Sequence, residues 1–162
     1  MKRAITVTAL VSGLAGVVVG AAGWYLFSPL FIDRVVAEAA PVSSGLQEVA
    51  SGAFRDADSA HRGTGTATIL TGGDRAILRF TEFEVTNGPD LEVWLVEAGD
   101  IQSSSDVTAS QWVSLGTLKG NVGDQNYDIP AGTDPNAYRS VVIWCEQFGV
   151  LFSPADLVPA GS

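Results

Sequence analysis

Residues 76–96 read AILRFTEFEVTNGPDLEVWLV and contain two strand patterns separated by a turn. The apolar positions of residues 76–85 change parity near Thr81-Glu82, which is the pattern of a strand interrupted by a β-bulge. Asn87-Gly88-Pro89-Asp90 predicts a turn, because Pro cannot donate to a strand ladder and Gly tolerates a positive φ. Residues 91–96 alternate again and predict the next strand.

The chain beyond residue 52 repeats this pattern of short alternating segments separated by Gly, Asn, Asp and Pro. About seven such segments predict an all-β fold, an antiparallel β-sandwich. Residues 98–110 are polar and predict a surface loop, and one helical turn is expected near residues 47–51. The predicted strands are residues 64–70, 76–85, 91–96, 112–115, 127–129, 138–145 and 150–152.

The composition excludes several classes of partner and site. The chain has 162 residues, of which 9 are basic and 18 acidic, so its net charge is −9. This balance, without any cluster of Lys or Arg, argues against nucleic acid and anionic lipid headgroups as partners of the soluble part. One Cys and one His exclude an intramolecular disulfide, a Cys-x-x-Cys pair and a Cys/His zinc site. The spacing of the Asp residues matches no EF-hand loop, so no metal site is predicted.

The N-terminal segment has the length and composition of a membrane anchor. Residues 4–32 contain no charged residue and are long enough to cross a bilayer as one transmembrane helix. Lys2 and Arg3 precede them, so the positive-inside rule predicts a single-pass protein of the cell membrane with a cytoplasmic N-terminus and an extracytoplasmic domain. The predicted parts are a membrane anchor (1–34), a linker (35–45), a β-sandwich domain (46–158) and a C-terminal tail (159–162).

A cleaved signal peptide is the alternative interpretation of this segment. Ala37-Glu38-Ala39 has the form of a signal-peptidase site, and cleavage there would make the domain a secreted protein. The anchor is favoured because the apolar run exceeds a signal-peptide core and because Asp33 and Arg34 separate it from that site. Gly16 and Gly20 form a GxxxG pattern that would allow a homodimer, although small residues are common in spans that do not pair.

Cys145 ends residues 140–145, the most apolar segment of the soluble part. Both faces of this strand are apolar, so the strand is predicted to be central and its thiol to be buried. Apolar burial suppresses thiol reactivity, and a small core residue is the commoner role for such a Cys. The functional alternatives are a redox thiol or a ligand to a prosthetic group such as haem iron.

His61 is the only other candidate ligand. It lies in an acidic segment, residues 56–63, before the first clear strand, where a solvated loop His is the commonest role. The functional alternative is a haem or copper ligand, and Met1 is the only Met, so His61 with Cys145 is the one possible His/Cys ligand pair.

Two further functions concern the single His and the tryptophans of the domain. A hydrolase is disfavoured, because the single His would have to serve it and there is no Gly-x-Ser-x-Gly elbow. Trp94, Trp112 and Trp144 suggest a ligand-stacking surface or an electron-hopping path, although tryptophans more often belong to a core or its rim.

The soluble part resembles the DM-thirteen domain family over residues 46–157. The most distinctive motif is the Phe-containing strand that runs into Gly-Pro-Asp-Leu, within Leu78–Leu95. The other matching segments, in order, are Gly52-Ala53-Phe54, His61, Gly65–Ile69, Ser114–Asn121, Gly123–Pro130, Tyr138–Cys145 and Phe148–Phe152.

This resemblance implies a β-sandwich related to the DOMON domains that bind haem or sugar, and electron transfer at the cell surface. Cys145 matches the position of the family's proposed redox cysteine, which would act as a bare thiol or hold a prosthetic group such as haem. His61 matches a recurrent His of the first motif. The leading hypothesis is therefore a membrane-anchored electron-transfer domain with a redox partner protein rather than a stand-alone enzyme. The alternative is a non-enzymatic envelope-binding module in which Cys145 is structural.

Overall fold

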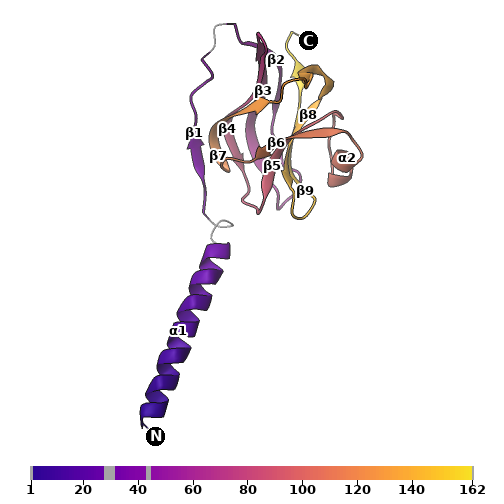
Figure 1. Cartoon of the computed structure of the whole chain (residues 1–162). Helices are drawn as coiled ribbons and strands as arrows, with labels where there is room; N and C mark the ends of the chain where they lie inside the picture. Colours follow the sequence, from indigo (N-terminus) through magenta and orange to yellow (C-terminus); the bar gives the residue numbers. More distant parts are fainter. Residues whose placement is uncertain (1, 28–31, 43–44, 162) are drawn as a thin grey trace. The chain divides into compact units, whose positions relative to one another are not determined.

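The computed structural model describes residues 2–27, 32–42 and 45–161 and divides the chain into two units, residues 1–32 and 33–162 (Figure 1). The first unit holds helix α1 (Lys2–Phe27), whose side chains are described for residues 12–24. Measured over the described residues, no helix is long and apolar enough to cross a membrane, which differs from the transmembrane helix predicted for residues 4–32. Residues 28–31 of that predicted span lie outside the described residues.

The second unit is a sandwich of two β-sheets, which confirms the predicted all-β domain (Figure 1). The larger sheet has six strands in the order β1-β7-β4-β3-β2-β10, and the smaller has four in the order β6-β5-β8-β9. All pairs are antiparallel except β1 with β7. The strands are β1 (Val35–Ala37), β2 (Gln47–Ala53), β3 (Gly63–Gly72), β4 (Arg75–Val85), β5 (Leu91–Val96), β6 (Trp112–Thr117), β7 (Val122–Ile129), β8 (Ser140–Cys145), β9 (Val150–Asp156) and β10 (Val158–Pro159).

The β-bulge predicted in β4 is present. The pairing of β4 with β3 shifts between Thr66↔Thr81 and Thr64↔Glu84, and Glu82 has a φ of 51°. The extra residue returns the later apolar side chains of β4 to the core, so both parities of the strand are buried. Phe80 and Phe83 consequently both pack in the centre of the sandwich, with ring centroids 4.8 Å apart.

Strand β8 is central and is covered on both faces, as predicted. Val141, Ile143 and Cys145 belong to the core between the sheets. Val142 and Trp144 point to the outer face of the smaller sheet and belong to a second apolar cluster. Because side chains alternate along a strand, this double burial explains the unbroken apolar sequence of β8.

Residues 98–110 are mostly exposed or partly exposed, as predicted, but they are not only a loop. They contain helix α2 (Ser104–Thr108), which lies beside the smaller sheet (Figure 1). Ile101 and Val107 are buried in the second cluster, and their burial fixes the segment against the sheet. The Asp106 carboxylate accepts the backbone N–H of Ser103 at 2.8 Å and stabilises the first turn. The other short helix in the described domain is η2 (Pro135–Ala137).

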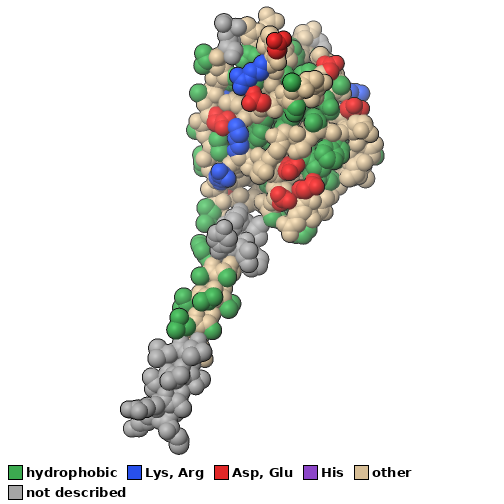
Figure 2. Space-filling model, viewed as in Figure 1, with side chains coloured by type: hydrophobic (Ala, Val, Ile, Leu, Met, Phe, Trp, Pro, Cys, Tyr) green, Lys and Arg blue, Asp and Glu red, His purple; other side chains and the backbone are tan. Residues whose placement is uncertain are grey.

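The start of the predicted linker belongs to the sandwich, because β1 pairs with Val122–Asp124 of β7. The Glu38 carboxylate then accepts bonds from Lys119 Nζ at 2.8 Å and from the Asn126 N–H at 2.7 Å. The hydrogen bond from Lys119 is the chief cause that holds the pKa of Glu38 below its ordinary value. Figure 2 shows most basic side chains of this view on the side where Figure 1 places β1, β4 and β7.

The prediction of a helical turn near residues 47–51 is wrong, because these residues belong to strand β2. A register shift between Glu48 and Ala50 breaks the alternation that would have revealed the strand. Strand β2 pairs with β3 on one side and with β10 on the other. It therefore extends the larger sheet.

Candidate functional site

Cys145 is fully buried, as the sequence predicts, with 0% of its surface exposed. It is the last residue of β8, opposite Leu91 of β5 and Val150 of β9. Its Sγ lies 3.1 Å from the carbonyl oxygen of Pro89, so the thiol donates to the Gly-Pro-Asp-Leu turn. The thiol is thus held in one orientation by a backbone acceptor.

The turn that covers Cys145 is short and partly exposed to solvent. Pro89 is partly exposed and Asp90, with a φ of 51°, is exposed. The carbonyl of Asp90 accepts the N–H of Glu146 at 3.0 Å, which ties the turn to the end of β8. The buried sulfur is consequently one residue away from a part of the chain that meets solvent.

His61 lies in the loop before β3 and is anchored by Asp58. Its Nδ1 lies 2.8 Å from Asp58 Oδ2, and Asp58 Oδ1 accepts the N–H groups of Ala60 and His61. The hydrogen bond from the His61 side chain is the chief cause that lowers the pKa of Asp58 from 3.8 to about 2. One ring nitrogen of His61 is therefore engaged within its own loop.

The Asp58 contacts predict a pH dependence of stability. A carboxyl whose pKa is lower in the folded chain adds stability above its unfolded pKa of 3.8 and loses it as the pH falls towards about 2. Thermal unfolding of the native chain and of Asp58→Asn should therefore differ most above pH 3.8, with the native chain more stable. The difference should shrink steadily between that pH and about 2. A difference that is constant with pH would contradict this assignment.

The structure brings the His61 and Cys145 segments to one end of the sandwich without bonding them to each other. The ring of Phe152 packs on His61, with ring centroids 4.3 Å apart. The same ring lies over Gly88, where a Cβ atom would meet it at 2.5 Å. In the described part of the chain the His61 ring bonds to Asp58, whereas the Cys145 thiol bonds to Pro89, so each side chain is held by a different partner.

These residues do not fit a haem. Cys145 has no exposed surface, and the Nδ1 of His61 is bonded to Asp58. A macrocycle needs a largely apolar cavity, whereas the cleft beside these segments is lined mainly by polar and charged groups. Across the described residues, no three His, Cys, Asp or Glu side chains are grouped so as to hold a metal ion.

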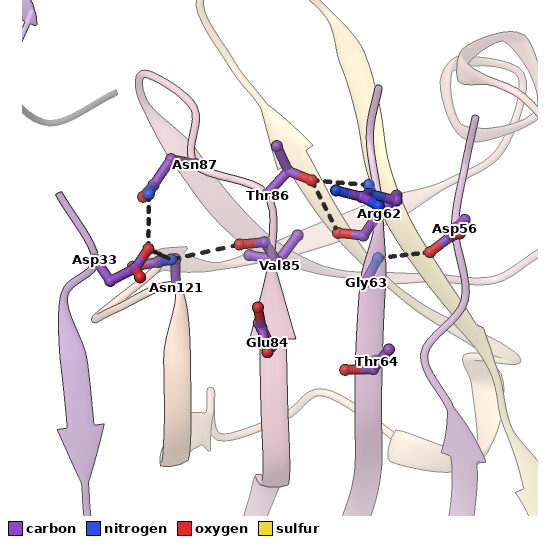
Figure 3. Close-up of a pocket in the computed structure, with 10 residues that line it drawn as sticks. All are labelled: Asp33, Asp56, Arg62, Gly63, Thr64, Glu84, Val85, Thr86, Asn87 and Asn121. Atoms are coloured by element: carbon purple, nitrogen blue, oxygen red, sulfur yellow. Dashed lines mark hydrogen bonds between the residues drawn. The ribbon is translucent and has the colours of Figure 1, made fainter. Parts of the chain in front are cut away.

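That cleft has a volume of about 500 Å³ and was not predicted (Figure 3). The Asp33 carboxylate accepts the amides of Asn87 at 2.9 Å and Asn121 at 2.8 Å. Figure 3 shows these three side chains together, beside the starts of β1 and β7 and past the end of β4, with Arg62 across the cleft at the start of β3. The lining residues are Asp33, Asp56, Arg62, Gly63, Thr64, Glu84, Val85, Thr86, Asn87 and Asn121.

The cleft adjoins both segments that the sequence singled out. Arg62 follows His61, and Asn87 lies two residues before Pro89. Its residues could not be found by spacing, because Asp33 and Asn121 are 88 positions apart in the chain. Only the fold brings them together.

Comparison with known proteins identifies the family. No curated protein and no solved structure matches the chain. The family model described as "Electron transfer DM13" matches residues 54–157, from the buried Phe54 to the residue before β10. This match includes the Gly-Pro-Asp-Leu turn, His61 and Cys145, and it covers more than half of the chain. The chain therefore belongs to the DM13 family, whose description is electron transfer.

Proposed function

We propose that this protein transfers electrons through Cys145 and that its domain is held at the outer face of a membrane by the N-terminal segment. The observation that carries the proposal is that the chain's only thiol lies within the domain matched by the electron-transfer family. The fixed contact between Sγ and Pro89, and the partly exposed turn that covers the sulfur, also favour electron exchange with a docked partner. An extracytoplasmic site favours a redox role, since the cytosol keeps thiols reduced.

The proposed redox step involves a single electron. An oxidised partner protein takes one electron from Cys145. The thiol proton passes to water when the Gly88–Asp90 turn moves away from the sulfur. A sulfur-centred radical remains until a donor returns the electron and water returns the proton. The partner would contact the Gly88–Asp90 turn, because this turn separates the sulfur from solvent.

The proposal is tested by mixing the full chain, in detergent, with hexachloroiridate(IV), which is a strong enough oxidant to take one electron from a thiol, and following the loss of the acceptor's colour. The native chain should reduce about one equivalent more than Cys145→Ala. This variant should remain folded, because removing the sulfur leaves only a small cavity that costs about 1 kcal/mol. Equal reduction by the two proteins would contradict a role for Cys145.

Membrane anchoring rests on the uncharged residues 4–32 and on the basic Lys2 and Arg3 before them. On this proposal the N-terminus is cytoplasmic, and pairing through Gly16 and Gly20 would give a homodimer. The full chain expressed in bacterial cells should stay with the membranes after alkaline carbonate extraction. A chain lacking residues 1–32 should be released. Release of the intact chain, or a mature N-terminus beyond Ala39, would favour the secreted form.

A binding module with a structural Cys145 is the second candidate, and the polar cleft of Figure 3 is the observation that favours it. Its carboxylates, amides and hydroxyls would recognise a small polar ligand through hydrogen bonds. NMR titration with monosaccharides and simple amines should then move the signals of Arg62 and Glu84. A native chain that shows these shifts and reduces no more hexachloroiridate(IV) than Cys145→Ala would support binding over electron transfer.

A further inference from the structure

Three tryptophans stack on the smaller sheet, on the face opposite Cys145. Trp94 of β5 stacks on Trp112 of β6 with ring centroids 3.8 Å apart and planes 10° apart. Trp94 also stacks on Trp144 of β8, at 5.1 Å and 29°. Trp112 is 46% exposed, whereas Trp94 and Trp144 are 4% and 3% exposed. The rings therefore form a continuous path from the surface into the second apolar cluster.

The central ring of this stack is bonded to a carboxylate. Trp94 Nε1 donates to Glu92 Oε2 at 2.7 Å, and Ser114 Oγ donates to the same oxygen at 2.7 Å. Glu92 and Trp94 are two residues apart on β5, so their side chains share a face. A charge-assisted hydrogen bond of this length fixes both the ring and its proton acceptor.

This pairing suits the loss of an electron coupled to the loss of a proton. An indole that loses an electron becomes a radical cation, and its N–H becomes strongly acidic. A carboxylate within 2.6–3.2 Å, as Glu92 is, can take that proton directly. Stacked neighbours give the electron a route to the surface, since Trp112 is in contact with both Trp94 and solvent.

We propose that the tryptophan stack is a second redox site, independent of Cys145, at which Trp94 and Glu92 undergo proton-coupled oxidation through Trp112. A strong one-electron oxidant at the surface takes an electron from Trp112. An electron then passes from Trp94 to the oxidised Trp112 and reduces it again. The Nε1 proton moves to Glu92 Oε2. The products are a neutral indolyl radical on Trp94, a protonated Glu92 and an oxidant reduced by one electron. Return of an electron from a donor, and of the proton from Glu92, restores the starting state.

The experiment uses photo-oxidised tris(bipyridine)ruthenium as the oxidant and transient absorption to follow the indolyl radical. It is done on the full chain in detergent, in a Trp24→Phe background, because Trp24 of α1 is 67% exposed and would also react. The neutral radical should form in this background. Trp112→Leu should lower its yield at least tenfold, because the oxidant loses its contact with the stack.

Glu92→Gln is the decisive variant. The glutamine side chain still accepts the Trp94 N–H, so the fold is kept. Because an amide is a far weaker base than a carboxylate, it does not take up the Nε1 proton. The radical cation should therefore replace the neutral radical at early times. Neutral radical formed as fast as in the parent, or an unchanged yield in Trp112→Leu, would overturn the proposal.

Two controls separate this site from other effects. Phe148→Leu removes an aromatic ring that is 64% exposed but is not in the stack, and it should leave the yield unchanged. Cys145→Ala should also leave it unchanged. A loss of yield in Cys145→Ala would contradict the independence of the two sites, whereas failure of the hexachloroiridate(IV) test of Cys145 would leave the tryptophan site unaffected.

Discussion

Replacing Phe80 by alanine is expected to lower the free energy of unfolding by about 3–5 kcal/mol, because it removes the centre of the aromatic core. Phe80 is 0% exposed. Its ring contacts those of Phe54, Phe83 and Tyr127, with centroids 4.9, 4.8 and 5.3 Å away. Residues from β4, β7 and the segment after β2 would all lose a packing partner. Chemical denaturation followed by tryptophan fluorescence measures the change.

Phe148→Ala is the matched control, since it removes the same side chain from a site that is largely exposed. Its effect should stay within about 0.5 kcal/mol. Equal destabilisation by the two substitutions would mean that Phe80 is not at the centre of the core.

Replacing Gly65 by alanine is the second change with a large expected effect, about 3 kcal/mol of lost stability. Gly65 lies opposite the bulge of β4 and has a φ of +103°. A Cβ atom there would meet the Cα of Phe83 at 2.6 Å, so the substitution adds a backbone clash to an unfavourable φ. The bulge would have to shift, and Phe83 with it. Thermal and chemical unfolding measure the loss.

Gly132→Ala separates the clash from the backbone strain. Gly132 has a φ of +88° but nothing within 4 Å of the position of a Cβ atom. Its substitution should cost only about 1 kcal/mol. A Gly65→Ala chain as stable as Gly132→Ala would show that the two strands separate at the bulge without cost.

The sequence predicts the sandwich best where its apolar pattern has a single cause. The parity change of residues 76–85 can only be reconciled with two buried Phe side chains by a bulge, and the bulge is present. The doubly apolar residues 140–145 likewise predict a central strand and a buried Cys145, and both are found. In each case alternate residues of the strand are apolar where their side chains are buried, so the sequence itself indicates which side chains face the core.

Prediction fails where long-range pairing or a few buried side chains override the local pattern. The local sequence of residues 35–37 is typical of a linker, but these residues pair in parallel with the edge of β7, and Lys119 binds the Glu38 that follows. Residues 98–110 read as a polar loop, but burial of Ile101 and Val107 holds them against the sheet. The cleft depends on contacts between segments far apart in the sequence, which no spacing reveals. A stacking surface of three tryptophans is suggested by the sequence, but only the pairing of β5 with β6 and β8 shows which rings touch.

The central claim is that Cys145 exchanges electrons, and protein-film voltammetry of the full chain beside Cys145→Ala tests it most directly. The native chain should give a reversible one-electron wave that Cys145→Ala lacks, with the circular dichroism of the two proteins the same. Oxidation of the tryptophan stack would appear separately, at higher potential, in both proteins. A wave of equal size and potential in both proteins, or none in either, would contradict the assignment of electron transfer to Cys145.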